Sequence, residues 1–241
     1  MSTAKGLAWF FFNTAFAKSL TFITQLVLGW LLVPNDFGLY AIAVSVGVFV
    51  GMMRNGGLDR ALIQKGKDFS EILPTAASYS LSFNILAMLA FLAIAPTVSS
   101  IYDDNRLLNM LIIMSFVLPA GTTAVLYRAK LSIDRRYKEL ALLKTISASI
   151  RQIMVLVFAL NGYGVYSFVL PMIIEVLTEV IIGYYYTRIS VTPLRFDLAV
   201  VKNLFHSCKW MMLASVMLGL ATTGDFFLLG LFISKEQLGV Y

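Results

Sequence analysis

Six ionisable residues interrupt long apolar runs of this chain, where charged groups are rarest. They are Lys18, Lys144, Arg151, Glu175, Glu179 and Asp225. A charge at the centre of a membrane helix costs about 2.5 to 3.5 kcal/mol on insertion scales, so each of these groups needs a partner or water. Basic groups at such depth suit the binding of an anion, whereas carboxylates suit a proton or Na⁺. These residue types predict either a polar pathway through a membrane bundle or a set of ion pairs inside it.

The composition of the chain identifies the surroundings of these charges. Hydrophobic residues make up 59% of the 241 residues, charged residues make up only 13%, and the mean hydropathy is +0.81. These values are typical of an integral membrane protein and exclude an ordinary soluble domain. One cysteine and one histidine exclude a disulfide framework and leave no cluster for a structural metal. The net charge of +6 lies in short basic blocks between apolar runs, which indicates membrane topology and not nucleic-acid binding.

The apolar runs predict an all-α polytopic membrane protein with seven spans. We expect helices over about 7–33, 39–53, 74–96, 107–127, 139–160, 165–186 and 207–233. The segment 34–38, rich in turn-forming residues, is predicted to end the first helix. Pro119 with Gly121 is expected to kink the fourth helix, and Pro171 is expected to kink the sixth.

The fifth and sixth predicted helices form an antiparallel hairpin about Gly162. Residues equally far from that turn lie at similar depth, so Arg151 falls opposite Glu175 and Lys144 nearly opposite Glu179. Two stacked ion pairs are therefore geometrically feasible. Two interpretations stay open, because the pairs could simply neutralise one another or could line a wet cavity.

Lys18 and Asp225 are poor partners for each other. Counted inward from the predicted outer turns, they differ by about 9 Å of helix rise. Lys18 therefore lies near the membrane midplane without an evident mate, on a helix that also carries a polar stripe of Thr14, Thr21, Thr24 and Gln25. A polar stripe on a spanning helix faces a cavity more often than lipid, so we expect Lys18 to face one.

The basic loops predict the orientation of the chain. One side of the membrane receives Arg54 and Arg60, five basic residues between 128 and 138, and four between 188 and 209. Short loops rich in Lys and Arg stay in the cytoplasm. The N-terminus is therefore expected inside, and the turns near Pro34, Asp103, Gly162 and Lys235 outside.

Residues 29–40 return in degenerate form as residues 230–241, with both glycines and the tyrosine aligned. This pattern predicts an internal repeat, although two membrane helices that end in similar turns could also look alike by chance. A repeat places one six-helix lobe in residues 1–190. Residues 191–241 would then be a cytoplasmic connection and the first helix of a second lobe, which this chain leaves truncated.

Two blocks of the sequence resemble a known family of transporters. The first block is Leu32-Val33-Pro34-Asn35-Asp36-Phe37-Gly38-Leu39-Tyr40, followed by Gly57-Leu58 and Ala61-Leu62-Ile63-Gln64. The second block is Arg136-Tyr137-Lys138-Glu139-Leu140-Ala141, followed by Asn161-Gly162-Tyr163-Gly164-Val165-Tyr166-Ser167. Both are similar to polysaccharide transporter proteins of the multidrug/oligosaccharidyl-lipid/polysaccharide exporter superfamily. Family members usually have twelve or more spans in two lobes of six, so the resemblance covers the first lobe and one further span.

The resemblance implies a flippase in the plasma (inner) membrane of a bacterium. Its substrate would be undecaprenyl-pyrophosphate-linked oligosaccharide for O-antigen, capsule or exopolysaccharide, and it would be neither an enzyme nor dependent on a cofactor. Its partners would be membrane lipids and the polysaccharide polymerase and chain-length proteins. The candidate ligands of the pyrophosphate are Lys18, Lys144 and Arg151 at depth, with Arg54 and Arg60 at the cytoplasmic rim. The carboxylates of Glu175, Glu179 and Asp225 are candidates for ion coupling or for lining the cavity.

Rival functions remain open. A cation-coupled drug antiporter of the same superfamily would use the intramembrane carboxylates, but the chain has more deep basic residues than that chemistry needs. A membrane polymerase or ligase would need a sizeable outer loop with catalytic groups, whereas the predicted outer turns are short. An inactive fragment is the third alternative.

Overall fold

The computed structural model describes residues 3–55, 62–63, 66, 69–191 and 197, and scattered positions between 201 and 218. Side chains are described at residue 13, over 15–47, and from residue 62 onward within those ranges. All regular structure in this part of the chain is helical. The helices are α1 (Thr3–Leu31), α2 (Pro34–Asn55), α4 (Phe69–Ile101), α5 (Asn105–Ala120), α6 (Thr122–Ile133), α7 (Tyr137–Leu160) and α8 (Tyr166–Thr187).

Several of these helices can cross a membrane. Among the described residues, α4, α7 and α8 are each long and apolar enough, and α5 with α6 makes a fourth span if the bent pair is counted as one. In α1 the apolar stretch that qualifies is the shorter Ala15–Leu31. The chain is thus a polytopic membrane protein, as predicted. The seventh predicted helix, over 207–233, lies outside the described residues except for isolated positions.

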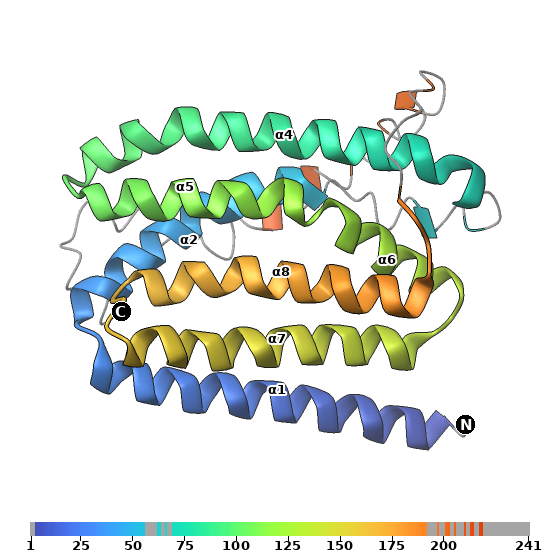
Figure 1. Ribbon diagram of the computed structural model, residues 1–241, viewed down its shortest axis with the longest axis horizontal. Helices are drawn as coiled ribbons and strands as arrows, with labels where there is room; N and C mark the ends of the chain where they lie inside the picture. The colour runs from blue at the N-terminus through green and yellow to red at the C-terminus, as the bar shows by residue number, and fades with distance from the viewer. Residues whose placement is uncertain are drawn as a thin grey trace.

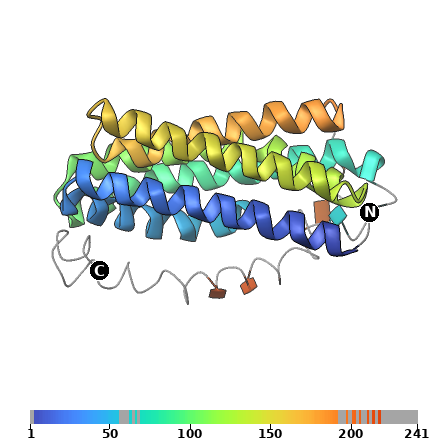
Figure 2. The same ribbon diagram turned by 90° about the horizontal axis from the view of Figure 1, so that it is seen from below.

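The helices lie side by side along the long axis of the molecule (Figures 1 and 2). The α1–α2, α4–α5 and α7–α8 turns gather at one end, drawn on the left in Figure 1. The starts of α1, α4 and α7 and the ends of α6 and α8 gather at the other. We call these the turn end and the basic end, because the second carries the predicted cytoplasmic connections.

Three predicted boundaries are wrong. The segment 34–38 is not a turn, because α2 begins at Pro34 directly after Val33. Proline suits the first helical position, since it has no N–H to leave unpaired and its φ is already helical. Pro74 and Pro96 do not bound the third predicted helix but lie inside α4. In lipid the backbone has no other partner, so a helix tends to continue through a proline.

The predicted kink near Pro119 is confirmed. The fourth predicted helix is divided at Gly121 into α5 and α6, which are inclined to each other by 44°. Pro119 cannot donate a backbone hydrogen bond, and Gly121 follows it in a position that ends α5. After the bend the chain stays helical to Ile133, so Arg128 and Lys130 belong to α6 and not to a connection.

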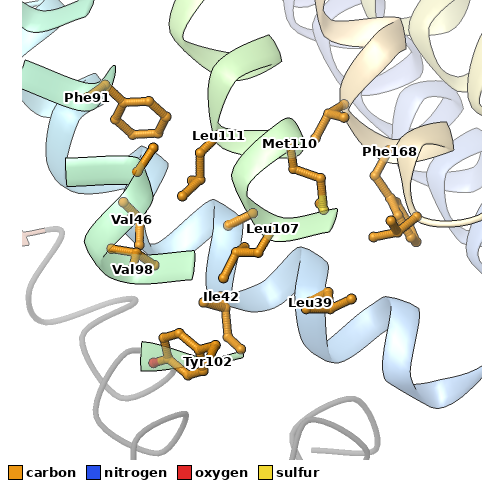
Figure 3. Packing of buried hydrophobic residues seen from close by; sticks show 14 of the residues in the cluster. Leu39, Ile42, Val46, Phe91, Val98, Tyr102, Leu107, Met110, Leu111 and Phe168 are labelled. Carbon is orange, nitrogen blue, oxygen red and sulfur yellow. The ribbon is translucent and has the colours of Figure 1, made fainter. Parts of the chain in front are cut away.

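The main core lies toward the turn end. Figure 3 shows Leu39, Ile42 and Val46 of α2 packed against Leu107, Met110 and Leu111 of α5, with contributions from α4 and α8. A smaller cluster near the basic end joins α4 to α6. Its buried members are Leu62, Phe69, Leu73, Ala76, Ala77, Leu126 and Ala129.

Candidate functional site

Arg151 of α7 reaches two other helices. Its Nη1 lies 3.4 Å from Oε2 of Glu175 on α8, and its Nη2 donates a hydrogen bond of 3.4 Å to the hydroxyl of Tyr40 on α2. Both charged side chains are part-buried, with 28% of Arg151 and 27% of Glu175 exposed. The ion pair predicted from equal distances to the Gly162 turn is therefore present.

The neighbouring residue extends the contact to α1. Gln152 donates from Nε2 to Oγ1 of Thr21 at 3.2 Å. Successive helical residues point about 100° apart. Arg151 can therefore face α8 and α2 while Gln152 faces α1. We call Thr21, Tyr40, Arg151, Gln152 and Glu175 the polar layer, which crosses the bundle through four helices.

The guanidinium of Arg151 has unused hydrogen-bonding capacity. Its Nε is buried and has no hydrogen-bond partner among the described residues, and its two polar contacts are both long. A buried charged donor without an acceptor costs free energy, which an anionic oxygen at this position would recover. Chemically, the polar layer offers a cation with hydrogen-bonding capacity for a phosphate oxygen, paired with a carboxylate.

The second predicted ion pair is wrong. Glu179 pairs with Nη1 of Arg128 on α6, and both side chains are part-buried. The helix bend at Gly121 brings α6 alongside α8, which the depth argument for a two-helix hairpin did not include. Lys144 is exposed instead and makes no ion pair with any described residue.

Lys18 is exposed on α1, and within the described part of the chain it also has no ion-pair partner. The polar stripe predicted for this helix is divided. Thr21 bonds to α7, Thr24 is buried, and Gln25 is exposed. α1 packs against α7, so Lys18 and Lys144 are carried by adjacent helices (Figure 1).

Three predicted site residues cannot be placed. Arg60 and Asp225 lie outside the described residues, as does the side chain of Arg54 near the end of α2. The second copy of the internal repeat, over 230–241, lies there too.

The turn end holds a polar cluster that sequence reasoning did not predict. Arg106 of α5 lies 3.2 Å from Oδ1 of Asp36 on α2 and 3.1 Å from Oδ2 of Asp104, the residue that caps α5. A Cβ added at Gly164, in the α7–α8 turn, would lie 3.9 Å from Oδ2 of Asp36. We call Asp36, Asp104 and Arg106 the turn-end cluster, because it sits where the three turns meet.

Sequence signals existed for some of these residues. Asp36 and Tyr40 both belong to the repeated 29–40 motif, and Gln152 is a second strongly polar residue beside Arg151 in an apolar run. The apolar run ends at Tyr127, so the sequence pattern places Arg128 in a loop, whereas the structure places it in α6. Its partner Glu179 therefore could not be identified.

Residues 27–241 match the model of the protein family described as Polysaccharide biosynthesis protein. Over 178 residues the chain is 21% identical to the succinoglycan biosynthesis transport protein ExoT of Rhizobium meliloti (strain 1021). That alignment covers 74% of this chain and 36% of the relative, so the chain spans about a third of the relative's length. No solved structure matches the chain. The family match extends over most of the sequence, from within α1 to its last residue, and the chain belongs to the polysaccharide biosynthesis protein family.

Proposed function

We propose that this chain contributes the first lobe of a flippase for polyprenyl-pyrophosphate-linked oligosaccharide. Residues 1–190 would form that lobe, and residues 191–241 the connection to a second lobe and its first helix. The observation that carries the proposal is the polar layer, which places Arg151 in the interior of an apolar bundle. The relative's description as a transport protein in succinoglycan biosynthesis supports transport over enzymatic chemistry.

The physical problem of such a transporter is the charged head of its substrate. A pyrophosphate with attached sugars cannot enter hydrocarbon, so it needs a polar path while its polyprenyl tail stays in lipid. Arg151 would supply one cationic group on that path, since its unpaired Nε and its long contacts leave hydrogen-bonding capacity for a phosphate oxygen. Lys18 and Lys144, exposed on adjacent helices, would supply two more.

Arg54 and Arg60 would capture the head group at the cytoplasmic rim. We place the basic end in the cytoplasm of a bacterium, the chain in its plasma membrane, and the turn end outside. With the cytoplasm negative, each anionic charge that moves outward releases about 2.3 kcal/mol per 100 mV. Ion coupling through Glu175, Glu179 or Asp225 would add to this drive but is not required. Polymerase and chain-length proteins would act on the product outside.

The cation-coupled antiporter is the alternative. It requires a carboxylate that takes up a proton or Na⁺ at depth. Glu175 and Glu179 are each paired with an arginine, so a Na⁺ ion would have to compete with that arginine for either carboxylate. This pairing supports anion transport as the better proposal.

The test uses the full-length protein in a bacterium whose surface polysaccharide depends on it. Arg151→Gln and Lys18→Ala should abolish surface polysaccharide while leaving the amount of protein in the membrane unchanged. Lys138→Ala removes an exposed positive charge at the start of α7 and is the matched control, expected to be silent. Normal polysaccharide from both Arg151→Gln and Lys18→Ala would reject the assignment of the site.

A charge exchange separates the site from a purely structural ion pair. Arg151→Glu and Glu175→Arg should each be damaging. If the double variant restores polysaccharide, the pair serves only to neutralise charge inside the bundle. We expect no rescue, because an arginine on α8 would not present its nitrogens where Arg151 presents them.

A further inference from the structure

The bend between α5 and α6 coincides with a buried polar layer in the facing helix. Asn84 lies in the middle of α4 and is fully buried. Its Nδ2 donates to the backbone oxygen of Ser80 at 2.9 Å and to Oγ1 of Thr122 at 3.1 Å. Thr122 is the first residue of α6, directly after Gly121. We call Ser78, Ser80, Asn84 and Thr122 the hinge layer; all four are buried.

The hinge layer separates the two apolar clusters of the lobe. On α4, the smaller cluster ends at Ala77 and the main core begins at Ala87. On the facing helices, the main core ends at Leu118 of α5 and the smaller cluster begins at Leu126 of α6. The two apolar clusters therefore share no residue within the α4–α5–α6 unit.

The hydrogen bonding of the hinge layer is incomplete. Oδ1 of Asn84 is buried and has no partner among the described residues. A buried acceptor without a donor costs free energy. A second arrangement of these helices that supplies a donor to Asn84 would recover that free energy. Pro119 also withholds the N–H that would bond to the carbonyl of Ser115, which weakens the backbone on the other side of the bend.

Different interhelical contacts hold the two ends of the lobe together. At the turn end, the turn-end cluster joins α2 to α5, and Tyr40 stacks on Phe168 with ring centroids 4.2 Å apart. At the basic end, α6 is fastened to α8 through Arg128 and Glu179, and Arg136 donates to the backbone oxygen of Tyr186 at 2.8 Å. α4 is joined to α6 there by the smaller cluster, in which three of the seven buried residues are alanine.

We infer that the lobe opens at its basic end by bending at Gly121, with the Asn84–Thr122 hydrogen bond as the pin that holds it closed. In this motion α6 moves with the adjoining part of α8, and the α4 side of the smaller cluster separates from it. The turn end stays fixed. The smaller cluster lies near the end of the lobe, so its side chains become accessible to water when they part. The inference concerns the lobe itself and does not rest on the substrate.

The experiment measures thiol accessibility in the full-length protein with Cys208 changed to serine. Ala76→Cys reports on the smaller cluster, and Ala95→Cys, on the same helix but in the main core, is the matched control. Both positions are buried in this structure. Labelling by a water-soluble maleimide in membranes is followed over time, with no substrate present.

Variants at the hinge should act in opposite directions. Asn84→Ala and Thr122→Val remove the pin, and the loss of one hydrogen bond should raise the labelling rate at position 76 about fivefold. Pro119→Ala combined with Gly121→Ala restores a backbone donor and removes the flexible residue, and should lower that rate. The rate at position 95 should stay unchanged in every case.

Two results would overturn the hinge. If labelling rises at both positions, the variants loosen the whole lobe and no hinge exists at Gly121. If the pin variants and the stiffening variant leave position 76 unchanged, the basic end does not open there. Because labelling needs no transport, these outcomes are independent of the polysaccharide test above.

Discussion

Single residues show where depth alone predicts a contact and where it does not. Arg151 and Glu175 were paired from their equal distances to one turn, and they do pair because α7 and α8 are adjacent. Lys144 and Glu179 satisfied nearly the same rule and do not pair. Equal depth places two side chains at the same level of the membrane but does not determine which neighbouring helix each one meets. Glu179 meets Arg128 on α6 and not Lys144 on α7.

The turn-end cluster leads to a prediction about stability. Only 9% of the Asp36 side chain and 12% of the Asp104 side chain are exposed, and Arg106 is the cation that faces both. Arg106→Ala should lower the free energy of unfolding by about 1–2 kcal/mol, because two carboxylates would remain without it. Arg106→Lys should recover only part of the loss, since a lysine cannot span two carboxylates as a guanidinium does.

Thermal unfolding of the purified protein in detergent measures this effect. Lys138→Ala, at an exposed position of the basic end, is the control that should leave the transition in place. A transition for Arg106→Ala that coincides with the control would mean that the cluster contributes nothing to stability.

At the scale of elements, helix existence was predictable and helix boundaries were less so. Long apolar runs predict α1, α2, α4, α7 and α8, and α5 with α6 as one bent helix, because only helices satisfy the backbone inside lipid. The sequence pattern predicts a helix boundary at Pro34, Pro74 and Pro96, whereas Pro34 begins α2 and α4 continues through the other two prolines. Pro119 differed because a glycine two residues later allowed the bend.

The contact between α6 and α8 depends on one glycine. A Cβ placed at Gly183 would come within 2.5 Å of Cδ2 of Tyr127 and within 2.9 Å of its Cβ. Gly183→Ala should therefore push α6 away from α8 and lower stability by about 1–3 kcal/mol, as overpacking does. Gly29→Ala, in α1 with no atom within 4 Å of the added Cβ, should be neutral or slightly stabilising.

Unfolding transitions of the two alanine variants provide the comparison. Tyr127→Ala should itself lower stability, because it removes a buried ring, but adding Gly183→Ala to it should cost little more, because the smaller side chain leaves space for the new methyl group. If Gly183→Ala and Gly29→Ala unfold at the same temperature, the close approach of α6 to α8 at Gly183 does not contribute to stability.

At the scale of the whole molecule, the arrangement of helices was beyond the reach of the sequence. α1 packs against α7 and not mainly against its sequence neighbour α2, and this places Thr21 beside Gln152. Such neighbours are decided by the summed fit of many apolar faces, which no local pattern records. The sequence did predict that the turns and the basic connections lie at opposite ends, because successive spans run in opposite directions (Figure 1).

That segregation leads to a prediction of orientation. Tyr163, in the α7–α8 turn, and Lys138, at the start of α7, are both exposed and lie at opposite ends of one helical hairpin. In the full-length protein with Cys208→Ser, Tyr163→Cys should react with a membrane-impermeant thiol reagent applied to spheroplasts. Lys138→Cys should react only after the membrane is opened, because the proposed orientation puts the basic end in the cytoplasm. The reverse pattern would place the N-terminus outside and would contradict the proposed capture of a substrate by Arg54 and Arg60 at the cytoplasmic rim.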